Sequence, residues 1–371
     1  MKKIVSLAVA FITALNLCAT CYAEPEDISA YSAVVINADT GEVLYEKNAH
    51  EKRAIASTTK IMTTLLTLEA GQPDRQFVAD SMAIRVEGTS MGLQEGDIVT
   101  RRALCYGMLL PSGNDAANAA AVSVSGSMEA FADEMNRKAA QIGMTNTNFV
   151  NPSGLDAEGH YSTAYDMAVL TRYALRNDEF SRICSSASAS LEYGNPPYKR
   201  TLYNSNKLLA QYDGCIGVKT GFTDEARRCL VSAAERDGKT VIAVTLNAPD
   251  DWSDHAELLD YGFEQLTAFE IAAESFTIPV FGSETREIRV SPESTATVGL
   301  SGNEHQYISI EYHLPAFVYA GIYKGEQLGT AEIYYKNEKI AGIPLIAENA
   351  CVRKTPEKDV FGRIMEIFGL S

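Results

Sequence analysis

Residues 57–71 read STTKIMTTLLTLEAG, and their apolar members recur at helical spacing. One face of this segment carries Ile61, Leu65 and Leu68. Gly71 is a typical residue for ending a helix, so we predict a helix over residues 57–69. Lys60 follows Ser57 by three residues, which places both side chains on the same side of the first turn.

Strand patterns flank this helix on both sides and predict a mixed fold. Apolar or β-branched runs occupy residues 33–36, 43–45, 229–233 and 240–246. Turn signals separate them at Asp39-Thr40-Gly41 and Asp237-Gly238. Helical patterns cover residues 101–143, 164–175 and 254–266. We therefore predict an α/β (α+β) domain, in which the late strands complete an antiparallel sheet begun by the first hairpin and helices pack on it.

The chain changes character beyond about residue 275, where it becomes rich in strands. Ile308, Ile310 and Tyr312 alternate with Tyr307, Ser309 and Glu311, while Lys324-Gly325 and Asn337-Glu338 are typical turn tips. Several short strands at near-regular spacing predict a C-terminal all-β sandwich domain. We place the larger domain over residues 24–272 and the β-domain over residues 273–352.

The first 23 residues have the pattern of a secretory signal. Lys2 and Lys3 precede an apolar run over residues 4–17, and Cys21-Tyr22-Ala23 provides small residues at the cleavage positions. The apolar run is short for a membrane-spanning anchor, so we predict a signal peptide over residues 1–23.

The last segment, residues 355–371, has an amphipathic helical pattern that follows Pro356. Its apolar face consists of Val360, Phe361, Ile364, Met365 and Phe368. The segment is too short to span a bilayer, so we expect it to lie in a membrane surface. The alternatives are a helix that packs on the β-domain and a frayed tail.

The charge of the chain argues against nucleic acid as a partner. The net charge is −16, and removal of Lys2 and Lys3 with the signal leaves 30 basic against 48 acidic residues, or −18. Such a chain repels phosphate backbones. Five cysteines and five histidines remain without the spacing of a metal site or a disulfide scaffold, so we predict no metal and no cofactor.

Three short motifs carry the reactive residues: Ser57-Thr58-Thr59-Lys60, Ser112-Gly113-Asn114 and Lys219-Thr220-Gly221. A serine hydroxyl becomes a strong nucleophile when a base takes its proton, and the Lys60 amine is within reach of Ser57. Lysine acts as a base when burial or a nearby cation lowers its pKa, and Lys219 would be that cation. We predict Ser57 as the nucleophile and Lys60 as its base.

The other motif residues suit a peptide substrate. The segment at Lys219 is expected at a strand edge, where a peptide can pair as an added strand next to Gly221. Lys219 and Thr220 can bind a carboxylate. The backbone N–H groups of Ser57 and Phe222 would form an oxyanion hole. Ser112 can pass a proton to the leaving amine, and Asn114 can hold the substrate amide and orient Lys60.

Each motif has a plainer interpretation when it is taken alone. Ser57 fits a helix N-cap, Ser112-Gly113-Asn114 fits a turn, and Lys219-Thr220-Gly221 fits a strand end. Their occurrence together, in this order and in the elements that the chemistry requires, favours a single active site.

The three motifs together resemble those of the serine penicillin-recognising enzymes. Most closely, the chain resembles the low-molecular-mass D-alanyl-D-alanine carboxypeptidases of the S11 peptidase type. The resemblance covers most of the chain after the signal and rests on residues 38–45, 56–63, 110–118, 151–155 and 217–223. It implies a β-lactamase/transpeptidase-like domain in an exported enzyme, at the outer face of the cytoplasmic membrane or in the cell wall space. It also implies that Ser57 attacks the D-Ala-D-Ala carbonyl of peptidoglycan pentapeptide stems, that D-alanine leaves, and that β-lactams acylate the same serine.

Two segments depart from the pattern of these relatives. Many relatives carry an arginine near the start of the late helix that helps to bind the terminal carboxylate, whereas residues 250–255 here read DDWSDH. His255, Arg227 or Arg228 are candidates to replace it, unless Lys219 and Thr220 suffice. Residues 225–228, EARR, also replace the small, glycine-containing turn usual at that place.

Three other functions share parts of this pattern. A class A β-lactamase needs a glutamate to activate the deacylating water, and no Glu-x-x-Leu-Asn segment lies between Ser112 and Lys219. A transpeptidase differs only in its acyl acceptor, so some transfer to an amine stays open. A non-catalytic wall-binding protein would have lost a catalytic residue, whereas every motif residue is present.

Overall fold

The computed structural model describes residues 24, 25 and 27–353. The expected signal peptide over residues 1–23 and the expected amphipathic helix over residues 355–371 lie outside these residues. Among the helices within the described ranges, none combines the length and the apolar character needed to cross a membrane.

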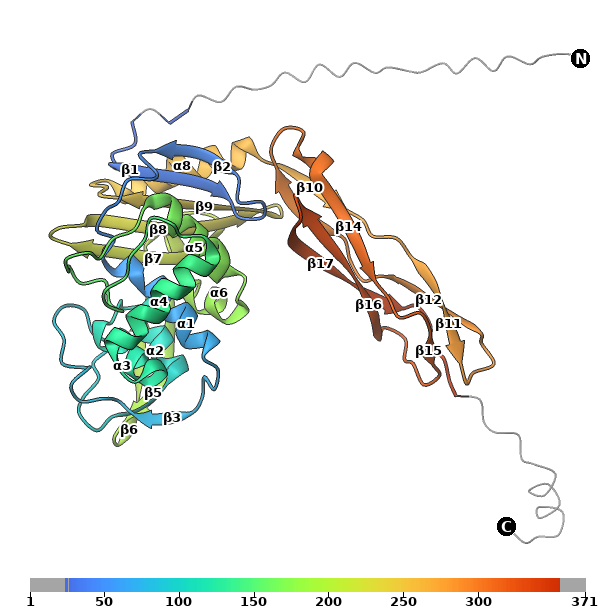
Figure 1. Ribbon diagram of the computed structural model, residues 1–371, viewed down its shortest axis with the longest axis horizontal. Helices are drawn as coiled ribbons and strands as arrows, with labels where there is room; N and C mark the ends of the chain where they lie inside the picture. Colours follow the sequence, from blue (N-terminus) through green and yellow to red (C-terminus); the bar gives the residue numbers. More distant parts are fainter. Residues whose placement is uncertain (1–23, 26, 354–371) are drawn as a thin grey trace, which may run out of the picture.

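A five-stranded antiparallel sheet forms the centre of the larger domain (Figure 1). Its strands lie in the order β2-β1-β9-β8-β7, so the first hairpin joins the three late strands, as predicted. The strands are β1 (Ser32–Asn37), β2 (Val43–Lys47), β7 (Cys215–Thr223), β8 (Arg227–Arg236) and β9 (Lys239–Leu246). β7 is an edge strand.

Helices cover both faces of this sheet. Helix α8 (Asp251–Gln265) packs on one face, where Val35, Val241 and Leu259 share an apolar cluster. The other face is covered by a second group of helices (Figure 1). This group consists of α1 (Lys60–Glu69), α2 (Arg101–Leu109), α3 (Asn114–Ser125), α4 (Met128–Ile142), α5 (Ala164–Leu175) and α6 (Asp178–Cys184). The short α7 (Leu208–Gln211) precedes β7.

The helix predicted from Ser57 begins three residues later than expected. Residues Ala56–Thr59 form a 3₁₀ turn, η1, and α1 begins at Lys60. Ala56 has a left-handed φ of 47°, a conformation that costs a non-glycine residue free energy and needs support from its surroundings. The turn therefore depends on contacts with other segments.

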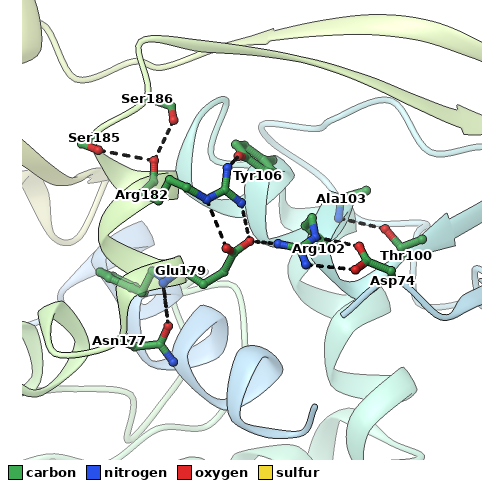
Figure 2. Close-up of polar contacts among 11 residues, drawn as sticks. Asp74, Thr100, Arg102, Ala103, Tyr106, Asn177, Glu179, Arg182, Ser185 and Ser186 are labelled. Atoms are coloured by element: carbon green, nitrogen blue, oxygen red, sulfur yellow. Dashed lines mark hydrogen bonds and ion pairs between the residues drawn. The ribbon is translucent and has the colours of Figure 1, made fainter. Parts of the chain in front are cut away.

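A network of charged side chains joins α2, α6 and the loop before β3 (Gln76–Val78), as Figure 2 shows. Arg102 of α2 donates to Asp74, with 2.6 Å between Nε and Oδ1, and also to Glu179 of α6. Arg182 donates to the same glutamate and, at 2.7 Å, to the Tyr106 hydroxyl. The bonds from Arg102 to Glu179 and from Arg182 to Tyr106 cross between the two helices and fix α6 against α2. Helix α6 packs in turn against β7.

Two small hairpins complete the larger domain. Strand β3 pairs with β4 (Ile98–Thr100), and β5 (Ser188–Gly194) pairs with β6 (Pro197–Tyr203).

The C-terminal part is all-β, as predicted, and forms an elongated body (Figure 1). A six-stranded sheet has the order β14-β16-β17-β12-β11-β15, and β10 pairs with β13 beside it. The strands are β10 (Thr267–Ile271), β11 (Phe276–Phe281), β12 (Glu287–Pro292), β13 (Ala296–Leu300), β14 (Ile308–His313), β15 (Val318–Tyr319), β16 (Gln327–Tyr335) and β17 (Glu338–Ala347), with a 3₁₀ turn η2 (Glu304–Tyr307). Val298, Ile333 and Leu345 belong to one apolar core that both sheets enclose.

Candidate active site

The turn η1 places Ser57 at the wall of a cleft of about 380 Å³. Local hydrogen bonds hold the turn in shape. The Thr58 hydroxyl donates to the Ile55 carbonyl at 2.6 Å, and the Thr59 hydroxyl donates to the Ala56 carbonyl at 2.8 Å. Ser57 is half-buried, so its hydroxyl stays accessible from the cleft.

Lys60 lies directly beneath Ser57 and is fully buried. Its Nζ lies 2.9 Å from Ser57 Oγ, 2.7 Å from Asn114 Oδ1 and 2.6 Å from the Ser153 carbonyl oxygen. Burial, and then the charge of Lys219, holds the pKa of Lys60 well below its usual range. The amine is thus suited to accept the proton of the Ser57 hydroxyl.

The Ser112-Gly113-Asn114 motif contributes one residue to the cleft lining and one to the buried surroundings of Lys60. Ser112 has a left-handed φ of 66° and lines the cleft, whereas Asn114 is buried at the start of α3. Asn114 donates from Nδ2 to the Glu87 carbonyl at 2.7 Å while its Oδ1 contacts Lys60. Asn114 therefore contacts Lys60 and is itself anchored to a backbone carbonyl.

The third motif lies on the edge strand β7, beside Ser57. Thr220, Gly221 and Phe222 line the cleft. A Cβ at Gly221 would lie 3.2 Å from the backbone nitrogen of Ser57, a tighter contact than most side chains make, so glycine allows the strand to lie close against the turn. This brings the backbones of Ser57 and Phe222 to the same end of the cleft.

The sequence analysis expected Lys219 to bind a substrate carboxylate, and the structure shows its side chain buried. It is 1% exposed, does not line the cleft, and donates from Nζ to the Thr220 carbonyl at 2.8 Å. Burial lowers its pKa to about 7. Its charge lies close enough to Lys60 to lower the pKa of that amine.

Several supporting residues were not found from the sequence. The Asp115 carboxylate accepts from Ser90 Oγ at 2.6 Å and from the backbone nitrogens of residues 91–93, which fixes that loop beside Ser112. His160 Nδ1 accepts from the Val150 N–H, so its Nε2 carries the proton that it donates to Thr59 Oγ1 at 2.9 Å. Burial lowers the pKa of His160 to about 4.

Of the three candidates to bind the terminal carboxylate, His255, Arg227 and Arg228, only Arg228 lines the cleft. His255 is fully buried between Ser232 and Thr245, and burial lowers its pKa to about 3, so it is neutral and faces away from the cleft. Arg228 lines the cleft, whereas Arg227 is outside its lining.

The comparison with known protein families and structures gives a consistent result. The family model described as D-alanyl-D-alanine carboxypeptidase matches residues 19–250, and the one described as penicillin-binding protein 5, C-terminal domain, matches residues 263–353. The D-alanyl-D-alanine carboxypeptidase DacF of Bacillus subtilis (strain 168) is 33% identical over 367 residues, which cover 94% of each chain.

Solved structures agree with these matches. The D-alanyl-D-alanine carboxypeptidase DacD from Francisella tularensis has a TM-score of 0.62 at 28% identity, and the match covers 89% of this chain and 95% of that one. The Streptomyces K15 DD-transpeptidase has a TM-score of 0.62 at 34% identity, over 65% of this chain and 99% of that one.

Proposed function

The chain belongs to the D-alanyl-D-alanine carboxypeptidase family, and we propose that Ser57 is the residue at which it is acylated. Members of this family are serine hydrolases that cleave the terminal D-alanine from D-Ala-D-Ala peptides through an acyl-enzyme. They bind β-lactams covalently in the same way. The enzyme class follows from membership, and the roles of individual residues are our proposal.

The observation that carries the assignment is the 2.9 Å separation of Ser57 Oγ from the buried Lys60 Nζ. Ser57 Oγ attacks the carbonyl carbon of the penultimate D-alanine while its proton passes to Nζ. The N–H groups of Ser57 and Phe222 stabilise the negative oxygen that forms. The C–N bond then breaks, and Ser112 relays the proton to the amino group of the departing D-alanine. Water hydrolyses the ester.

The substrate pairs with the open edge of β7 in this proposal. A peptide that enters along residues 220–222 forms main-chain hydrogen bonds with the strand, and its last peptide bond comes to rest above Ser57. The Thr220 hydroxyl, 3.0 Å from Ser205 Oγ, is then available to the terminal carboxylate. Asn114 and Gly221 complete the binding site.

The domain boundaries and the location of the enzyme extend this proposal. We assign catalysis to residues 24–272 and a separate β-domain to residues 273–352, with β10 as the connecting strand. The family acts on cell wall peptidoglycan, and the signal pattern of residues 1–23 supports export. The apolar face within residues 355–371 supports attachment to the outer face of the cytoplasmic membrane.

Intact-mass measurement after mixing with benzylpenicillin tests the nucleophile. We expect the wild-type chain to gain the mass of one penicillin, and Ser57→Ala to gain none while it keeps its fold. Ser205→Ala and Ser112→Ala, which change two other serines of the cleft, should still form the adduct. A persistent adduct on Ser57→Ala would show that another residue is the nucleophile.

A further inference from the structure

One arginine of the cleft has no role in the chemistry described so far. Arg228 lies on β8 directly opposite Phe222 of β7. Opposed residues of an antiparallel pair share one face of the sheet, and Thr220, two residues from Phe222, shares it too. The guanidinium of Arg228 and the hydroxyl of Thr220 therefore project on the same side of the strand edge that is open to a peptide, and both line the cleft.

The side chain of Arg228 is held in a fixed orientation. Asp251, whose side chain is 4% exposed, accepts from its Nε at 3.0 Å and from its Nη2 at 2.7 Å through one oxygen. The Trp252 ring centre lies 5.7 Å from its Cζ. Nη1 has no acceptor among the residues that the structure describes, and the side chain is 42% exposed. One edge of the guanidinium is thus anchored and the other is free for an anion.

Other cations near the cleft are less suited to hold a carboxylate. Lys219 is buried and already donates to the Thr220 carbonyl. Lys207 lines the cleft, but its exposed ammonium has no ion-pair partner in the described part of the chain to fix it. A flexible lysine loses more conformational freedom on binding than an arginine that is already oriented.

We propose that Arg228 binds the C-terminal carboxylate of the substrate, together with the Thr220 and Ser205 hydroxyls. The carboxylate-binding arginine of this chain then comes from β8, whereas in many relatives it lies near the start of the late helix. Trp252, at that place in α8, packs against the Arg228 guanidinium. By binding the carboxylate, Arg228 makes the enzyme select peptides that end in a free carboxylate. The inference rests on the proposed function, because it concerns the same bound peptide.

The test compares two substrates, diacetyl-L-lysyl-D-alanyl-D-alanine and the same peptide with a C-terminal amide. The wild type should prefer the carboxylate. In Arg228→Met we expect the ratio of the two kcat/KM values to fall on the order of 100-fold, since a charge-assisted hydrogen bond is lost, with the amide reaction nearly unchanged. Arg228→Lys should keep part of the preference because it retains the charge without the two-pronged geometry.

Arg227→Met is the matched control, because it removes the same charge one residue away, outside the cleft lining, and should keep the wild-type ratio. An equal loss for both peptides would mean that Arg228 only supports the fold, and an unchanged ratio would also overturn the proposal. The affinities of both peptides for the Ser57→Ala chain, with and without Arg228→Met, need no acylation. They therefore decide the role of Arg228 even if Ser57 is not the nucleophile.

Discussion

Lys60 and Lys219 are both buried, yet their surroundings suit them to different tasks. Lys60 has three oxygen neighbours, one of which is Ser57 Oγ, the proposed nucleophile, while Lys219 contacts the backbone carbonyl of Thr220. Burial lowers the pKa of both, and the charge of Lys219 lowers that of Lys60 further. The charge of Lys219 thus favours the neutral form of Lys60, the form that accepts a proton in the proposed mechanism.

The pH dependence of acylation should report this coupling. Lys60 acts as a base only when deprotonated, so activity is present above its pKa and is lost as the pH falls through it. Lys219→Gln removes the neighbouring charge and raises the pKa of Lys60. We expect the acid limb of the benzylpenicillin acylation rate to move to higher pH by about one unit.

The control for this shift is Arg227→Gln, which loses the same charge outside the cleft lining and should leave the acid limb in place. A midpoint that is unchanged or lower in Lys219→Gln would contradict the coupling, whatever the overall loss of rate.

Sequence reasoning identified contacts between side chains that lie close together in the sequence. The three-residue spacing of Ser57 and Lys60 predicted their contact, because local spacing fixes it. The acceptor at the Ser153 carbonyl and the support from His160 arise from tertiary packing, and a backbone oxygen carries no residue-type signal. The burial of Lys219 was not predictable from its motif, because the register of β7 directs its side chain into the core, and its contact with a substrate carboxylate stays a prediction.

At the scale of elements, the loop over residues 151–155 supports the turn η1, which carries Ser57. Its Pro152 carbonyl accepts from Thr63 Oγ1 at 2.6 Å, and its Ser153 carbonyl contacts Lys60. A Cβ at Gly154, whose φ is 82°, would lie 1.9 Å from the Ala56 carbonyl oxygen. The loop and the turn are therefore close enough that only glycine fits between them.

Gly154→Ala should separate the loop from the turn and misplace Lys60. We expect the acylation rate to fall by about 100-fold, as displacements near 1 Å can cause in an active site. Gly159→Ala is the control, because its φ of 81° imposes the same backbone strain while its nearest contact is an ordinary 3.7 Å. Equal rates in the two variants, measured with benzylpenicillin, would contradict the supporting role.

The elements themselves were predictable where their periodicity is strong. The helix over residues 164–175 and the hairpin around Asp237-Gly238 have the positions that the sequence predicted. The start of the helix at Ser57 was wrong because the left-handed Ala56 and the contact with Gly154 hold residues 56–59 in a tighter turn. Such a turn depends on a segment almost a hundred residues away, which a local pattern cannot show.

At the scale of the molecule, two sets of polar contacts join the larger domain to the β-domain. Asn37 and Asp39 bond to the backbone of Gly299 at 2.8 and 2.9 Å, and Arg172 and Arg176 both pair with Glu338. These partners lie far apart in sequence, so no local pattern predicted them. Cys351 forms a β-bridge with Ile322. The described chain ends at residue 353, at the end of the β-domain that lies away from the larger domain (Figure 1).

Membrane attachment is the prediction that belongs to this scale. We expect the mature chain to sediment with phospholipid vesicles, and a chain without residues 355–371 to stay in solution while it still releases D-alanine. Ile364→Asp with Phe368→Asp should lower the bound fraction by about tenfold or more, because burial of two large apolar side chains is lost. Vesicle binding by the shortened chain would refute the anchor.

The open edge of β7 has a consequence for the protein at high concentration. A strand edge that accepts a peptide also offers unpaired backbone groups to a second copy, the route by which many β-proteins aggregate. Here α6 contacts the first half of the strand, with Cys184 Sγ 3.4 Å from the Ile216 carbonyl oxygen. The second half contains residues 220–222, which line the cleft and can pair with the end of a short peptide, and we expect this length to be too short for stable pairing between two enzymes.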